Sequence, residues 1–114
     1  MYKVTKDDSN DYIYLHPKGD HEYTMIFLHG LGDSSSGFAD VFKQGMCPKN
    51  CRIVLPTAPV AAVSCNGGSE MTSWFDIFEL SPTTIPDLTK IRAMLNQDDV
   101  AKSVALLNKL IEQE

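Results

Sequence analysis

The feature that most constrains the fold of this chain is the segment Met25–Asp33, with the sequence Met-Ile-Phe-Leu-His-Gly-Leu-Gly-Asp. It is a continuous apolar run, Met25–Leu28, that stops at a loop with two glycines. Such a run is typical of a strand that is buried on both faces of a parallel sheet. Gly30 and Gly32 allow φ > 0 and a close approach of the backbone, which leaves the amide of Leu31 able to face another group. An amide presented in this way can act as an oxyanion-hole donor. The sequence therefore predicts a strand that opens into a site-forming loop.

The elements around this loop follow from apolar spacing and from turn residues. Strands are expected at Tyr12–His16, as an outer strand, at Thr24–Leu28, and at Arg52–Leu55, where proline ends the strand. A helix is expected to start at the capping hydroxyls of Ser34–Ser36 and to run to about Gly45. A strand, a helix and a further strand in this order predict a right-handed parallel crossover.

The second half of the chain predicts a hairpin and two helices. Asn66–Gly68 favours φ > 0 between two short strand-like segments, which is typical of a hairpin turn. A short helix is expected to begin near Pro86 and to carry the apolar residues Leu88, Ile91 and Leu95. The final helix is expected to be capped by Asn96, and its apolar stripe needs a sheet face to cover: Val100, Val104, Leu107, Leu110 and Ile111.

Composition and charge exclude several classes of protein. The 114 residues carry a formal net charge of −5 from scattered acids, which argues against a nucleic-acid or anionic-lipid surface. Three cysteines, an odd count, and a polar N-terminus argue against a secreted disulfide scaffold, so a reduced, cytoplasmic protein is expected. No apolar run approaches the roughly 18 residues of a membrane span, so no stable membrane insertion is expected.

Four spaced motifs carry a resemblance to a known family. They are Phe27–Asp33, Leu55–Val60 (Leu-Pro-Thr-Ala-Pro-Val), Asn66–Gly68 and Ser73–Ile77 (Ser-Trp-Phe-Asp-Ile). In this order they resemble the N-terminal half of the acyl-protein thioesterase (phospholipase/carboxylesterase) family. The fold implied is an α/β-hydrolase-like, mainly parallel sheet flanked by helices, with residues 1–114 as the N-terminal part of a single domain.

The resemblance also implies a chemistry. It is serine hydrolysis of acyl thioesters or carboxyl esters on an acylated protein or a lipid ester, without a metal or organic cofactor. The backbone amide of Leu31 would be one oxyanion donor, and Trp74 would lie beside the acyl-binding channel. His29, Gly30, Gly32 and Asp33 are interpreted as residues that shape the loop.

The nucleophile that this chemistry needs is not found in the 114 residues, which contain no Gly-x-Ser-x-Gly turn. The later Asp and His of the family pattern are missing as well, so we expect the chain alone to be inactive. Ser34–Ser36 are interpreted as helix caps rather than as nucleophiles. The alternative is a non-catalytic truncated product or pseudo-enzyme that binds a partner or an acyl group.

Competing motifs fail at specific positions. Gly30–Ser35 nearly matches the dinucleotide fingerprint, but its last position is serine and no acid follows at the expected distance of roughly 20 residues. Gly32–Gly37 has P-loop spacing, yet Phe38 and Ala39 stand where Lys and Ser/Thr are needed. Cys47 and Cys51 lack partners for a zinc site, so buried or idle thiols are expected. With few strands present, an exposed sheet edge predicts self-association.

Overall fold

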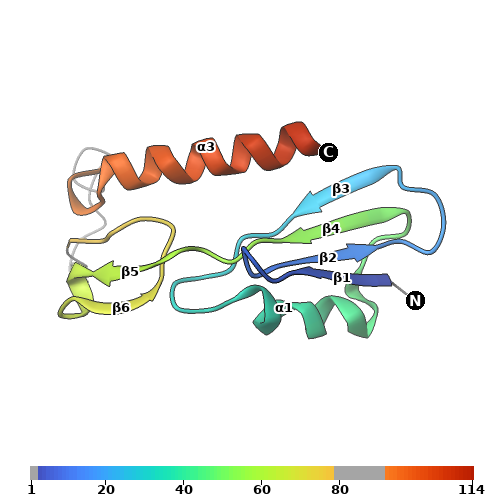
Figure 1. The fold of residues 1–114 in the computed structure, drawn as a ribbon, viewed down its shortest axis with the longest axis horizontal. Helices are drawn as coiled ribbons and strands as arrows, with labels where there is room; N and C mark the ends of the chain where they lie inside the picture. The colour runs from blue at the N-terminus through green and yellow to red at the C-terminus, as the bar shows by residue number, and fades with distance from the viewer. Residues whose placement is uncertain (1–2, 79–91) are drawn as a thin grey trace. The chain divides into compact units, whose positions relative to one another are not determined.

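The structure, a computed structural model, describes residues 3–78 and 92–114. Contacts divide the chain into two compact units, Met1–Ala58 and Pro59–Glu114, and each unit is described by itself. The first unit contains a four-stranded sheet and the helix α1, and the second contains a two-stranded hairpin and the helix α3 (Figure 1). The α/β class predicted from the sequence is confirmed. The domain assignment for residues 1–114 stays a prediction.

The sheet of the first unit is mixed, whereas the sequence analysis expected a mainly parallel sheet: among the described strands, only one of the three pairs is parallel. Its strands are β1 (Lys3–Asp7), β2 (Tyr12–His16), β3 (Tyr23–Ile26) and β4 (Cys51–Leu55). The spatial order is β1-β2-β4-β3; the pairs β1–β2 and β2–β4 are antiparallel, and β3–β4 is parallel. The parallel crossover between β3 and β4 was predicted, and the strand limits agree with the sequence to within about two residues, the usual scatter at element ends.

The interpretation of Tyr12–His16 as an outer strand is wrong, because β1 lies outside it. The turn between the two strands is held by the Asp7 carboxylate, which accepts bonds from the Ser9 amide at 3.1 Å and the Ser9 hydroxyl at 2.7 Å. Asp11 takes a positive φ of 55° as the chain enters β2. As an inner strand, β2 buries Leu15 completely. The half-polar sequence of β1 offered no hydrophobic signal for this strand.

The prediction that Thr24–Leu28 is buried on both faces is also wrong. Among the described residues of the first unit, β3 pairs only with β4 and ends at Ile26. Thr24, at the start of the predicted run, is exposed, and Leu28, at its end, is 41% exposed. An apolar run marks a strand but does not tell how many neighbours the strand has.

The core of the first unit lies between the sheet and α1 (Ser35–Val41). Ser34 caps this helix by accepting a bond from the Gly37 amide, as predicted. A kinked turn at Phe42–Met46 follows, in which Gln44 and Gly45 leave helical geometry; Gly45, with a φ of 98°, lies where the predicted helix ends. The buried cluster consists of Ile13, Leu15, Ala39, Phe42, Cys51, Ile53 and Leu55. Phe27 packs against this cluster and stacks edge-on with Phe42 at 5.4 Å between ring centroids.

The second unit confirms the predicted hairpin. Strands β5 (Val60–Val63) and β6 (Ser69–Thr72) pair in antiparallel fashion. A 3₁₀ turn at Ser64–Asn66 joins them through Gly67 and Gly68, which both take positive φ values, of 69° and 81°. These left-handed conformations explain the two successive glycines.

Helix α3 spans Gln97–Gln113 and begins where the sequence predicted. Its cap, Asn96, accepts a bond from the Asp99 amide at 3.1 Å. In the predicted apolar stripe Leu110 is buried, whereas Val104 and Ile111 are about half exposed. The start of the helix predicted near Pro86, with Leu88 and Ile91, lies outside the described residues. Within residues 3–78 and 92–114, the helices are too short or too polar to cross a membrane.

The two outer strands of the sheet differ in charge. β1 carries Lys3, Lys6 and Asp7, whereas β3, Tyr-Thr-Met-Ile, carries no charged side chain. Charged side chains on an edge strand oppose pairing with another chain. We therefore propose that copies of this chain associate through β3 rather than through β1.

The substitution Tyr23→Lys places a charge on β3 and should lower the mass of the assemblies seen by sedimentation velocity. The matched control is Val4→Lys on β1, at a residue that is 42% exposed, and it should leave the distribution unchanged because this edge is already charged. An equal response of the two variants would contradict the assignment of the associating edge.

Candidate active site

The parallel pairing of β3 and β4 brings two loops to one edge of the sheet. Ile26 pairs with Val54, and the Phe27 amide continues the ladder by donating to the Val54 carbonyl at 3.0 Å. The loop that follows β3 and the loop Pro56–Ala58 that follows β4 therefore leave the sheet side by side. Ligand sites in open α/β sheets lie at the carboxyl ends of the strands, so this edge is the candidate site of the first unit.

His29 joins these two loops. Its imidazole is buried, with 4% of the residue exposed. Nε2 accepts the Ala58 amide at 2.9 Å, and Nδ1 lies 2.7 Å from the Gly30 carbonyl oxygen. Because an acceptor nitrogen carries no hydrogen, Nδ1 carries the proton of the neutral ring and donates it to Gly30. The ring thus connects residues 29 positions apart in the sequence, Ala58 and His29.

The glycine loop forms a tight turn over Gly30–Asp33. The Asp33 amide donates to the Gly30 carbonyl at 3.1 Å, and Gly32, in the third position, has a φ of 78°. This is the pattern of a type II turn, which requires glycine at that position. Leu31 lies in the second position, 42% exposed, and its amide has no hydrogen-bond acceptor among the described residues.

The expectation that both glycines of this loop take a positive φ is wrong for Gly30. Gly30 does not take a positive φ, and a Cβ placed on it would meet no atom within 4 Å. Only Gly32 uses the conformational freedom that the sequence analysis attributed to both glycines. Nothing in the described residues explains why position 30 is glycine.

Asp33 holds the end of the loop against the first turn of α1. Its Oδ1 accepts the Ser34 amide at 2.8 Å. The same oxygen would lie only 2.1 Å from a Cβ at Gly37, so the carboxylate occupies the space of that missing side chain. In this geometry Asp33 acts as a local hydrogen-bond acceptor.

A second connection between the loops escaped the sequence analysis. Ser35 is 1% exposed; its amide donates to the Thr57 hydroxyl at 2.9 Å, and its own hydroxyl donates to the Asp11 carbonyl at 3.0 Å. Thr57 donates back to the Ser35 hydroxyl at 2.8 Å. The partners lie 22 and 24 residues from Ser35, and no local pattern predicts them.

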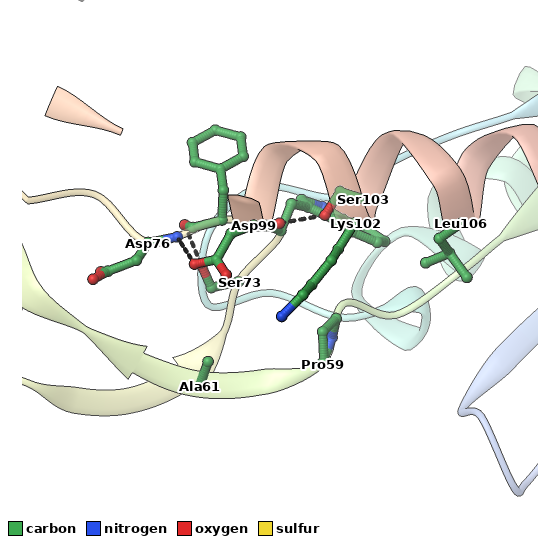
Figure 2. Close-up of a pocket in the computed structure, with 10 residues that line it drawn as sticks. Pro59, Ala61, Ser73, Asp76, Asp99, Lys102, Ser103 and Leu106 are labelled. Carbon is green, nitrogen blue, oxygen red and sulfur yellow. Dashed lines mark hydrogen bonds between the residues drawn. The ribbon is translucent and has the colours of Figure 1, made fainter. Parts of the chain in front are cut away.

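Trp74 lies in the second unit, beside a pocket of about 140 Å³. Figure 2 shows side chains from the hairpin, from the segment after β6 and from α3 around this pocket. The lining includes Pro59, Ala61, Trp74, Phe75, Lys102 and Leu106. Its apolar members provide a surface for a small apolar group. Trp74 belongs to the second unit and Leu31 to the first, and each residue is described only within its own unit.

Two bridges tie the Trp74 segment to α3. The Ser103 hydroxyl donates to the Trp74 carbonyl, and the Asp76 amide donates to the Asp99 carboxylate at 3.0 Å. The Asp76 carboxylate in turn accepts the Ser64 hydroxyl at 2.5 Å and the Ser64 amide at 2.8 Å. These two hydrogen bonds hold the pKa of Asp76 below its ordinary value, and the bond from the Ser64 hydroxyl has the larger effect.

The three cysteines are unpaired thiols. Burial raises the pKa of the Cys51 thiol, which keeps it protonated and unreactive. In the described stretches, 3–78 and 92–114, no group of three or more His, Cys, Asp or Glu side chains is placed to hold a metal ion.

Comparison with known proteins identifies the family of this chain. A phospholipase/carboxylesterase family model matches residues 13–114. The chain belongs to this family. Its fold agrees, because the crystal structure of Zea mays acyl-protein thioesterase 2 superposes with a TM-score of 0.70 at 33% identity, over 90% of this chain and 40% of that one.

Two curated relatives illustrate the range of the family. Acyl-protein thioesterase 1 of Yarrowia lipolytica is 36% identical over 100 residues, which are 85% of this chain and 40% of the relative. A probable inactive carboxylesterase of Oryza sativa subsp. japonica is 33% identical over 93 residues, or 79% of this chain and 35% of the relative. The chain thus spans about two fifths of the length of the family members it matches.

The contact between Asp33 and position 37 predicts an unusual response to Gly37→Ala. Alanine normally favours a helix over glycine by up to about 1 kcal/mol. Here the new methyl group must displace the Asp33 carboxylate and break its bond to Ser34, so we expect a loss of about 1 kcal/mol in urea denaturation. In an Asp33→Ala background the same substitution should become neutral or stabilising. A stabilising Gly37→Ala in the unchanged chain would contradict the contact.

The lowered pKa of Asp76 predicts a pH dependence of the second unit. Because the folded pKa is below the unfolded one, this group stabilises the fold at pH values above the ordinary carboxyl pKa, and the contribution is lost as the pH falls through the folded pKa. Denaturation measured from pH 7 to pH 2 should show a weaker loss on acidification for Asp76→Asn than for the unchanged chain. Asp20→Asn, at an exposed carboxylate, is the control and should keep the original profile. Parallel profiles for the Asp76→Asn variant and the unchanged chain would refute the assignment.

Proposed function

We propose that this chain supplies the oxyanion-hole part of a serine hydrolase that cleaves acyl thioesters or carboxyl esters. In the proposed reaction a serine attacks the acyl carbonyl, an acyl-enzyme forms, and water then releases the acid. The Leu31 amide donates a hydrogen bond to the oxyanion of each tetrahedral intermediate. A donor held in place before the reaction stabilises the developing charge without reorganisation.

The turn at Gly30–Asp33 is the observation that carries this proposal. It lies at the carboxyl end of β3, beside the loop after β4, and it offers an amide that no described acceptor occupies. Two buried polar connections hold the turn, through His29 and through Ser35. An unoccupied, well-supported amide at such an edge is what an oxyanion hole requires.

The proposed substrate is an acylated protein or a lipid ester. Relatives in the family are named acyl-protein thioesterases, which favours a thioester-linked acyl group on a protein. The apolar lining around Trp74 supports a role for this residue in contacting an acyl chain. The three unpaired thiols support a reducing, cytoplasmic location.

We propose further that the 114 residues alone do not turn over such substrates. Ser34 and Ser35 carry the hydroxyls closest in sequence to the turn, and both are engaged in structural bonds. The Ser35 hydroxyl, 1% exposed, cannot reach a substrate carbonyl. In this proposal the nucleophile is a residue outside these 114 residues.

The second candidate is a non-catalytic member of the family that binds a partner or an acyl group. The rice relative, which is named a probable inactive carboxylesterase, favours it. In this case the Trp74 pocket of the second unit would bind a ligand without a covalent step.

A chimera tests the hydrolase proposal. Residues 1–114 are joined to the part of the maize acyl-protein thioesterase 2 that this chain does not cover. The chimera should hydrolyse acyl thioesters, and Leu31→Pro should lower kcat by about 10² to 10³-fold, because proline lacks the amide hydrogen. Proline suits the second position of a type II turn, so the loop itself should persist.

Leu31→Ala is the matched control, since it keeps the amide and changes only the side chain; its kcat should remain within a few-fold of the parent. A folded, cooperatively melting chimera in which Leu31→Pro is as active as Leu31→Ala would refute the role of this amide. In parallel, the 114-residue chain should neither hydrolyse p-nitrophenyl esters nor react with a fluorophosphonate probe. Stoichiometric labelling of any of its serines would show that a nucleophile lies within the chain.

A further inference from the structure

The Leu31 amide belongs to the same peptide unit as the Gly30 carbonyl, and this carbonyl is strongly engaged. It accepts the His29 Nδ1 hydrogen at 2.7 Å and the Asp33 amide at 3.1 Å. Since the described peptide bonds are all trans, the N–H of Leu31 points opposite to the C=O of Gly30. Whatever holds the Gly30 oxygen therefore aims the Leu31 hydrogen.

His29 is held in turn from its other side. Nε2 accepts the amide of Ala58, in the loop after β4, at 2.9 Å. The ring is buried, so it cannot exchange these partners for water without moving the loop. A donor at Nδ1 and an acceptor at Nε2 select one neutral tautomer.

We propose that His29 is a positioning residue for the oxyanion hole: its Nδ1–H tautomer, selected by the Ala58 amide, fixes and polarises the Gly30–Leu31 peptide. The inference rests on the proposed function, in which Leu31 is the oxyanion donor. A carbonyl that accepts two hydrogen bonds makes the N–H of its own peptide a stronger donor. The loop after β4 thereby acts on the oxyanion donor without touching the substrate.

The test uses solid-state NMR on the full chain, labelled with ¹⁵N in its histidines and with ¹³C′ and ¹⁵N in the Gly30–Leu31 peptide. Solid-state spectra can be recorded whether or not the chain self-associates. His29 should show a protonated Nδ1 and an unprotonated Nε2. A protonated Nε2 with a bare Nδ1 would overturn the proposal.

Three substitutions separate the two bonds of the ring. His29→Asn keeps a donor near the position of Nδ1, His29→Gln keeps an acceptor near the position of Nε2, and His29→Leu removes both. The Gly30 carbonyl and Leu31 amide signals should shift most in the Leu and Gln variants and should be recovered, at least in part, by Asn. His21→Gln, at an exposed histidine that bonds to Thr24, is the control and should leave the peptide unchanged.

Two results would overturn the proposal. One is a Gly30–Leu31 peptide that keeps its signals in His29→Leu while the Ala58 amide shifts, which would show that His29 supports only the loop after β4. The other is an Asn variant that restores these signals no better than Leu. Because no readout needs turnover, these failures are distinct from failure of the hydrolase proposal, which the Leu31→Pro chimera tests.

Discussion

The parallel pairing of β3 with β4 is the constraint on which the first unit depends. Parallel strands end at the same edge of a sheet, so this pairing places the loop at His29 beside the loop at Ala58, although the two are far apart in sequence. It also positions the chain for α1 and for the turn that follows it, and Ala39 of the helix and Phe42 of the turn belong to the core cluster with the sheet. Without this pairing neither the turn at Gly30–Asp33 nor its supports would be assembled.

Buried polar groups hold the loops at the carboxyl ends of β3 and β4 in one conformation. The imidazole of His29 and the hydroxyl of Ser35 are almost fully buried, and each finds donors and acceptors on a neighbouring loop. A buried polar group that loses its partner costs about 1 to 3 kcal/mol, which is a large part of the stability of a small domain. Other positions of the loop are therefore penalised, and the Leu31 amide is held ready for an acceptor. This rigidity is what the proposed chemistry needs, because an oxyanion donor is effective only when it is aimed before the charge develops.

In the second unit, side-chain hydrogen bonds likewise connect segments that are distant in the sequence. Asp76 connects the hairpin turn at Ser64 to the start of α3 at Asp99, and Ser103 holds the backbone of Trp74. These bonds hold the backbone segment that carries Trp74 along the lining of the pocket. The loop of the first unit and the pocket of the second are thus each a surface supported by hydrogen bonds from distant segments.

The sequence alone determined the local features of this protein: the caps Ser34 and Asn96, the glycine turn between β5 and β6, and the limits of β2 and β4, because each depends on residues within a few positions of one another. Its spaced motifs also determined the family. Only the tertiary structure decided that β1 lies outside β2, that β3 is an outer strand of its unit, and that His29 and Ser35 bond across the loops. The order of the strands and the contacts between residues 22 to 29 positions apart arise when the sheet assembles. The hydrophobic pattern of one sequence does not specify which neighbour each strand or each buried polar group will contact.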